Sequence, residues 1–121
     1  MGDANVIPVE VVRAEGGRAT VSIAGHEISI PCAETTSAGA AWLVVRPEVV
    51  RLAAGDGEAM RGVVLDLAFR GAGYSYHVEV SGLSEPVKAE TPAELGAPFG
   101  VGSEVAVTWD LDACGLLPRE A

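Results

Sequence analysis

The chain has 121 residues and a formal net charge of −9, with seventeen Asp and Glu against eight Lys and Arg. Proteins that bind nucleic acid neutralise phosphates with basic grooves, and single-strand binders add exposed aromatic platforms. This chain has no basic cluster and two each of Phe, Tyr and Trp. The composition therefore argues against nucleic acid as a partner.

The length and hydrophobic pattern also bound the architecture and the location. One domain, or two very small domains that share a core, fit into 121 residues. No stretch approaches the roughly 20 apolar residues that a membrane-spanning helix needs. The segment Met1–Asn5 lacks the basic and apolar regions of a signal peptide. We therefore expect a cytoplasmic protein.

The sequence contains one pattern of short strands twice. Valine-rich segments separated by glycine turns predict antiparallel strands joined by hairpins. In the first half they cover residues 9–12, 19–23, 28–30, 42–46 and 49–52. In the second half they cover residues 63–67, 74–80, 87–89, 105–109 and 114–117. Five short strands with a longer connection before the fourth are typical of an OB-like barrel. We expect an all-β fold of two small OB-like antiparallel barrel units packed together, with little helix.

Alternation with a period of two predicts which side chains of each strand share a face. Four groups of apolar side chains are expected to share a face in this way: Ala19/Val21/Ile23, Val63/Leu65/Leu67/Phe69, Tyr74/Tyr76/Val78/Val80 and Val105/Val107/Trp109. These strands are expected to be half-buried. The segment Trp42–Val45 is apolar on both faces, which predicts a central strand or a strand that covers an interface.

The predicted division is a first unit at residues 1–54, a linker at 55–61 and a second unit at 62–121. The linker is assigned from the Gly- and Ala-rich stretch Ala53–Glu58. The second copy is longer, and its added length falls in the loop Thr91–Gly100, which has room for one helical turn.

No residue pattern in the chain indicates catalysis or a bound cofactor. Zinc sites need three or four clustered ligands, whereas His26 and His77 are separated and are expected to be exposed. Cys32 and Cys114 are expected to be reduced, half-buried thiols. No nucleophile lies near a positioned base, and no phosphate-binding G-x-x-x-x-G-K-[ST] loop is present.

Two short segments have unusual chemistry. Pro47 directly follows a strand and is expected to end or redirect it, leaving Arg46 and Glu48 on either side of a fixed bend. These two charges are free to pair with each other or with a neighbouring subunit. The turn Gly71–Gly73 follows Arg70 and offers backbone N–H groups to an anion. A plain hairpin turn is the favoured interpretation of its glycines.

Short motifs in a fixed order run along the chain: Gly2–Asn5, Arg46–Glu48, Gly62–Val64, Phe69–Gly71 with Tyr74, Val101–Val105, Trp109–Asp110 and Leu116–Pro118. Their order and spacing resemble the C-terminal TOBE-type regulatory domain of ABC transporter ATP-binding subunits, in the importer class that handles polyamines and ferric iron. The resemblance marks six residues as candidates for family-motif, structural or interface roles: Asn5, Arg46, Pro47, Glu48, Arg70 and Gly71.

The resemblance implies a non-catalytic domain that pairs ATP-binding subunits and modulates transport. Its partners would be a second copy in a homodimer, an ATPase domain of the same chain preceding residue 1, and indirectly the membrane permease at the inner face of the cell membrane. ATP and Mg²⁺ would bind that ATPase domain, so no cofactor is expected here.

The alternative function is a small-ligand or oxyanion sensor on the same barrels, with Arg46, Arg70 and the glycine turns as donors. The related molybdate-binding modules carry a Ser-Ala-Arg-Asn-like start, which is missing from this chain.

Overall fold

The computed structural model describes residues 4–54, 60–93 and 99–119. Their regular structure is almost entirely β: β1 (Asn5–Glu15), β2 (Arg18–Ile23), β3 (His26–Pro31), β4 (Gly39–Val45), β5 (Val50–Ala53), β6 (Met60–Phe69), β7 (Gly73–Val80), β8 (Val87–Pro92), β9 (Glu104–Trp109) and β10 (Gly115–Pro118). Two 3₁₀ turns, η1 (Pro47–Val49) and η3 (Leu111–Ala113), interrupt them. Within these three stretches, no helix has the length and apolar character needed to cross a membrane.

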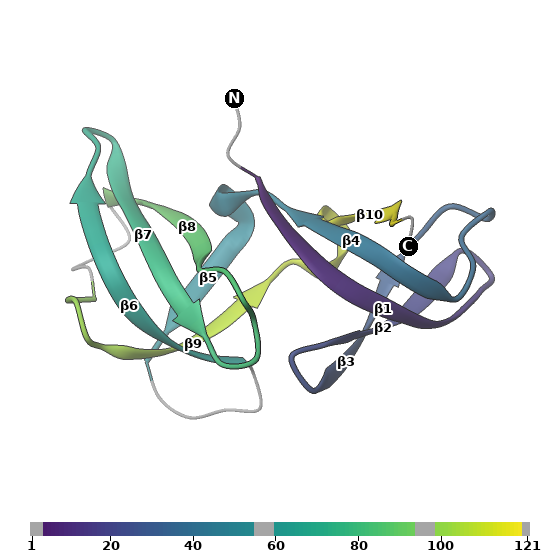
Figure 1. The fold of residues 1–121 in the computed structure, drawn as a ribbon. Coiled ribbons are helices and arrows are strands. Elements are labelled where there is room, and N and C mark those ends of the chain that lie inside the picture. The colour runs from purple at the N-terminus through teal and green to yellow at the C-terminus, as the bar shows by residue number, and fades with distance from the viewer. Residues whose placement is uncertain (1–3, 55–59, 94–98, 120–121) are drawn as a thin grey trace.

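The strands form two five-stranded antiparallel sheets that lie side by side (Figure 1). The first has the order β10-β4-β1-β2-β3 and the second has the order β5-β9-β6-β7-β8. One continuous cluster of buried apolar side chains draws on both sheets. The prediction of an all-β fold with two antiparallel units and little helix is confirmed.

The two sheets exchange strands. β5 belongs to the first half of the chain but pairs with β9 of the second sheet, through Val50 opposite Trp109. β10 ends the second half but pairs with β4 of the first sheet, through Gly115 opposite Val44. The predicted units 1–54 and 62–121 therefore do not coincide with the sheets, because a local strand pattern does not encode pairing partners.

The predicted linker and loop fall largely outside the described residues. Positions 55–59 of the linker lie outside the described residues, while Met60 and Arg61 already form the start of β6. Positions 94–98 of the loop Thr91–Gly100 are also outside the described residues, so its helical turn stays a prediction.

Three of the four predicted apolar faces are the buried faces. The inward residues of β2, β7 and β9 are buried, with the sole exception of half-buried Tyr74 at the start of β7. β4 lies centrally between β1 and β10, as its two-sided apolar pattern predicted. Its Leu43 and Val45 are fully buried, while Trp42 and Val44 are half-buried on the opposite face.

The apolar face predicted for β6 is wrong. At the start of β6, Met60, Gly62 and Val64 face the core, and Leu65 is 43 % exposed. Leu67 instead packs against the core, opposite buried Tyr76. Phe69, at the end of the strand, is 62 % exposed. The pairing of β6 with β7 shifts register between Val64 and Asp66. This bulge adds one residue to β6, so the period of two breaks there. Val63 and Leu65 therefore lie on the outward face, whereas Leu67, beyond the bulge, lies on the inward face.

Gly62 provides a test of how closely the second sheet packs. A Cβ atom at this position would meet Val78 Cγ1 at 2.5 Å and the Glu79 carbonyl oxygen at 3.0 Å. We expect Gly62→Ala to lower the free energy of unfolding by about 1–3 kcal/mol through overpacking, measured by urea titration. Gly115→Ala is the matched control, because nothing lies within 4 Å of a Cβ atom there. Equal stabilities of the two variants would contradict this packing.

Candidate functional site

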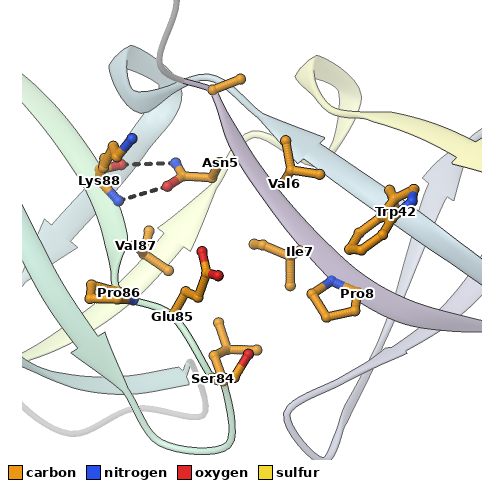
Figure 2. Close-up of a pocket in the computed structure, with 12 residues that line it drawn as sticks. Asn5, Val6, Ile7, Pro8, Trp42, Ser84, Glu85, Pro86, Val87 and Lys88 are labelled. Atoms are coloured by element: carbon orange, nitrogen blue, oxygen red, sulfur yellow. Dashed lines mark hydrogen bonds between the residues drawn. The ribbon is translucent and has the colours of Figure 1, made fainter.

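The side chain of Asn5 connects the two sheets. Asn5 begins β1 and is 6 % exposed. Its Nδ2 donates to the Val45 carbonyl oxygen at 3.1 Å and to the Lys88 carbonyl oxygen at 2.9 Å. The Lys88 backbone N–H donates to Asn5 Oδ1 at 2.7 Å (Figure 2). The amide thus pairs with the backbone of β8 as a neighbouring strand would.

These hydrogen bonds indicate that the Asn5 side chain has a structural role. An amide nitrogen has two hydrogens, and both are engaged by backbone carbonyls of different strands. A buried polar group that is fully hydrogen-bonded stabilises a unique arrangement, whereas the same group without partners is costly. Asn5 is therefore a structural connection between β1, the end of β4 and β8, with no free donor for a ligand.

A groove lies beside this connection, between the first sheet and the segment that leads into β8. Figure 2 shows Val6, Pro8 and Trp42 on one side and Ser84, Glu85 and Pro86 on the other. Its volume of ≈ 220 Å³ is below the range of about 300–1,000 Å³ typical of small-molecule pockets. Its ionisable residues are Glu85 and Lys88, one of each sign. The groove therefore offers neither the room nor the charge that would favour a sizeable anion.

The Arg46-Pro47-Glu48 segment forms the crossing from the first sheet to the second. β4 ends at Val45, and buried Pro47 begins η1, which packs against β8 and leads into β5. The expected redirection of the strand by proline is thus observed. Arg46 and Glu48 are exposed, and no ion pair joins them in the described part of the chain. Instead, the Arg51 guanidinium donates to the Glu48 carbonyl oxygen at 2.9 Å.

A second groove brings Glu48 and Arg70 together from different halves of the chain. Its other lining residues lie in Ala72–Ser75 and Glu90–Pro92. Gly71 has φ 72°, a left-handed conformation that favours glycine. Two N–H groups of the turn are used within it, since Arg70 N donates to Gly73 O and Ala72 N donates to Arg70 O, each at 2.7 Å. With two carboxylates to one guanidinium, this groove does not resemble an anion site.

The cysteines and histidines lie apart at the surface. Cys32 and Cys114 are free and half-buried, as predicted. Burial raises the pKa of the Cys114 thiol, and the carboxylates of Asp110 and Asp112 raise it further. His26 is exposed, and the His77 ring lies 2.7 Å from the Asp66 carboxylate. Among the described residues, no three His, Cys, Asp or Glu side chains are grouped as metal ligands.

The six candidate residues thus fall in three places. Asn5 joins the sheets, Arg46–Glu48 form the crossing, and Arg70 with Gly71 form the β6–β7 turn. The fold brings Glu48 and Arg70 to one groove, and Arg46 is not part of its lining. No local sequence pattern marks Lys88 as the partner of Asn5, because the two residues are 83 positions apart.

The family model of the TOBE domain matches residues 43–117, more than half of the chain. The chain belongs to the TOBE domain family. The match runs from β4 through the crossing at Pro47 to β10, so it includes both places where strands are exchanged.

Relatives of this TOBE domain are found among import proteins. It is 40% identical over 79 residues to the Fe(3+) ions import ATP-binding protein FbpC of Rhizobium etli, covering 65% of this chain and 22% of that protein. The corresponding protein of Brucella abortus is 38% identical over the same length and coverage. The spermidine/putrescine import ATP-binding protein PotA of Ruegeria pomeroyi is 29% identical over 119 residues, 97% of this chain and 32% of that protein. The chain thus spans less than a third of each of these relatives.

A solved structure shares the fold of this TOBE domain. The cytoplasmic molybdate-binding protein ModG, with molybdate bound, superposes with a TM-score of 0.71 over 95% of this chain and 96% of that chain. The sequence identity is 17%, so this likeness establishes a common OB-like architecture.

The connecting role of Asn5 is tested by an isosteric change. Asn5→Asp keeps the oxygen that accepts from Lys88 N but removes both donors, so the carbonyl groups of Val45 and Lys88 lose this amide and face a carboxylate. We expect the free energy of unfolding to fall by about 3 kcal/mol, measured by urea titration at neutral pH. Ser84→Ala, across the same groove, is the control and is expected to change it by less than about 0.5 kcal/mol. A variant Asn5→Asp as stable as this control would refute the role.

Proposed function

We propose that this chain is a non-catalytic regulatory and pairing domain of the ATP-binding subunit of an ABC importer. The observation that carries the proposal is the match to PotA, which covers 97% of this chain but 32% of that protein. The remaining length of such a subunit would hold the ATPase domain, preceding residue 1, with its ATP and Mg²⁺. The permease would be an indirect partner, and the subunit would lie in the cytoplasm at the inner face of the membrane.

The architecture suits a domain that links subunits. The two sheets share strands and one core, so they form one body rather than two modules that move independently. A two-fold pair of such bodies would hold two attached ATPase domains near each other. Linkage of this kind raises the effective concentration of the ATPase domains, which would remain paired after ATP leaves.

A chimera tests the proposal. The region of the Rhizobium etli FbpC protein that matches this chain is replaced by residues 1–121. We expect the truncated subunit without this region to lose nucleotide-independent pairing and the chimera to regain it, measured by sedimentation with and without ATP. A subunit that carries ModG in the same place is the control, since ModG shares the fold at 17% identity. A chimera that sediments like the truncated subunit would overturn the proposal.

Oxyanion sensing is the second candidate function, favoured by the fold shared with molybdate-bound ModG. The occupied donors of Asn5, the mixed charges of the groove beside it and the acidic groove at Arg70 weigh against it. We expect molybdate, tungstate, sulfate and phosphate each to leave the Tm unchanged, measured by thermal unfolding at matched ionic strength. A rise in Tm with one of these anions, absent in Arg70→Ala, would instead favour a sensor.

A further inference from the structure

The outer face of the first sheet carries apolar side chains in register across three strands. Antiparallel residues that lie directly opposite point to the same side of a sheet. The registers of β1, β4 and β10 place the outward residues in three rows, which we call the outer face: Val6/Val44/Gly115, Pro8/Trp42/Leu117 and Glu10/Ala40/Arg119.

The first two rows contain no ionisable residue, although they lie at the surface. Val6 is 52% exposed and Leu117 is 56% exposed. The Arg119 guanidinium lies 5.1 Å from the centroid of the Trp42 ring, which places it on the same face. Single exposed apolar residues are ordinary, but contiguous ones indicate an interaction surface. Trp and Arg are also the residues that most often dominate binding energy at interfaces.

We propose that the outer face packs against the same face of a second copy of this chain, around a two-fold axis that runs along β4. This inference rests on the proposed pairing function and names the surface that performs it. Two sheets stacked face to face are about 10 Å apart and nearly aligned. A two-fold axis parallel to β4 places each row of one copy over the same row of its partner. It also places β1 of each copy over β10 of the other.

This rotation produces complementary contacts in all three rows. Trp42 meets the partner's Trp42 near the axis, and Leu117 meets the partner's Pro8. Val6, which projects from the sheet, lies over the partner's Gly115, which has no side chain. Glu10 lies over the partner's Arg119, and the symmetry repeats this pairing of opposite charges on the other side. A surface that is complementary to itself is what an isologous dimer requires.

The exposed face of the second sheet is less suited to pairing with its own copy, because of its charges. Val63 and Leu65 are exposed apolar residues of β6, but Val63 lies between Glu104 of β9 and Glu79 of β7. Arg61, also outward on β6, pairs with Glu104 at 3.8 Å. The same two-fold operation along β6 would place Glu104 over the partner's Glu79, a contact between like charges. With a net charge of −9, two copies repel at long range. A face that lacks acidic flanking pairs is therefore the one suited to self-association.

The size of the outer face predicts a reversible contact. Three strands about 4.8 Å apart and three rows about 6.8 Å apart cover about 300 Å² on each copy. Stable complexes bury about 800 Å² on each partner. Free chains are therefore expected to pair weakly, and chains held close by other domains are expected to pair strongly.

Cross-linking tests the surface and its symmetry. In a Cys32→Ser, Cys114→Ser background, Val44→Cys places a thiol on the axis, where it faces its own copy. A short bis-maleimide that spans the roughly 10 Å between packed sheets is expected to join two chains into a covalent dimer. Leu65→Cys, 43% exposed on the second sheet, is the matched control and is expected to stay monomeric. Similar dimer yields from the two variants would overturn the proposal.

A charge-reversal cycle tests the predicted contact between Glu10 and Arg119. In the Val44→Cys chain, Glu10→Arg or Arg119→Glu alone is expected to lower the dimer yield about threefold to fivefold at low salt. Both reversals together are expected to restore it, because each copy again presents opposite charges. A double variant as low as the single variants would refute this register. Urea midpoints equal to that of the parent establish that the variants are folded.

The experiments distinguish failure of the proposed pairing function from failure of the proposed surface. A chimera that pairs, combined with a Val44→Cys chain that does not cross-link, would overturn the surface and leave the pairing function standing. Cross-linking through Val44→Cys, combined with a chimera that does not pair, would support the surface and overturn the assignment to an importer subunit.

Discussion

One buried amide joins the two sheets by hydrogen bonds. The side chain of Asn5 forms hydrogen bonds to the Val45 carbonyl at the end of β4 and to both backbone groups of Lys88 in β8. In the described part of the chain, β1 and β8 belong to different sheets, so this amide bonds one sheet to the other. Hydrogen bonds are directional, whereas the apolar contacts around them are not. The amide therefore fixes the relative position of β1, β4 and β8. The crossing at Pro47 and the shared apolar core hold the same two sheets together.

Local sequence patterns predicted the strands but not their partners. Alternation identified the buried faces of β2, β7 and β9, and Pro47 marked the end of β4, because these properties depend on neighbours along the chain. The bulge after Val64 could not be read in this way, since an extra residue leaves no compositional sign. The exchange of β5 and β10 and the convergence of Glu48 with Arg70 depend on contacts between distant segments. For the same reason, Asn5 could be recognised as part of a family motif but not as the connection between the sheets.

The exposed faces of the two sheets differ in the charges that they carry. On the exposed face of β6, Glu79 and Glu104 lie on either side of Val63, and Glu104 pairs with Arg61. The outward rows of β1, β4 and β10 are apolar or carry one charge of each sign. A net charge alone keeps molecules apart, so selective contact requires that the repulsive groups be kept away from one face. The first sheet meets that requirement and the second does not.

The exchange of strands also bears on the order in which the protein acquires its structure. A ribosome makes β10 after β1 to β9, yet β10 covers the free edge of β4 in the first sheet. The first sheet is therefore incomplete until β10 has been made, although β1, β2, β3 and β4 emerge first. During that interval β4 presents unpaired backbone groups, the kind of edge that recruits strands from other molecules. The four residues of β10 thus protect the first sheet from aggregation, although they are made long after β4.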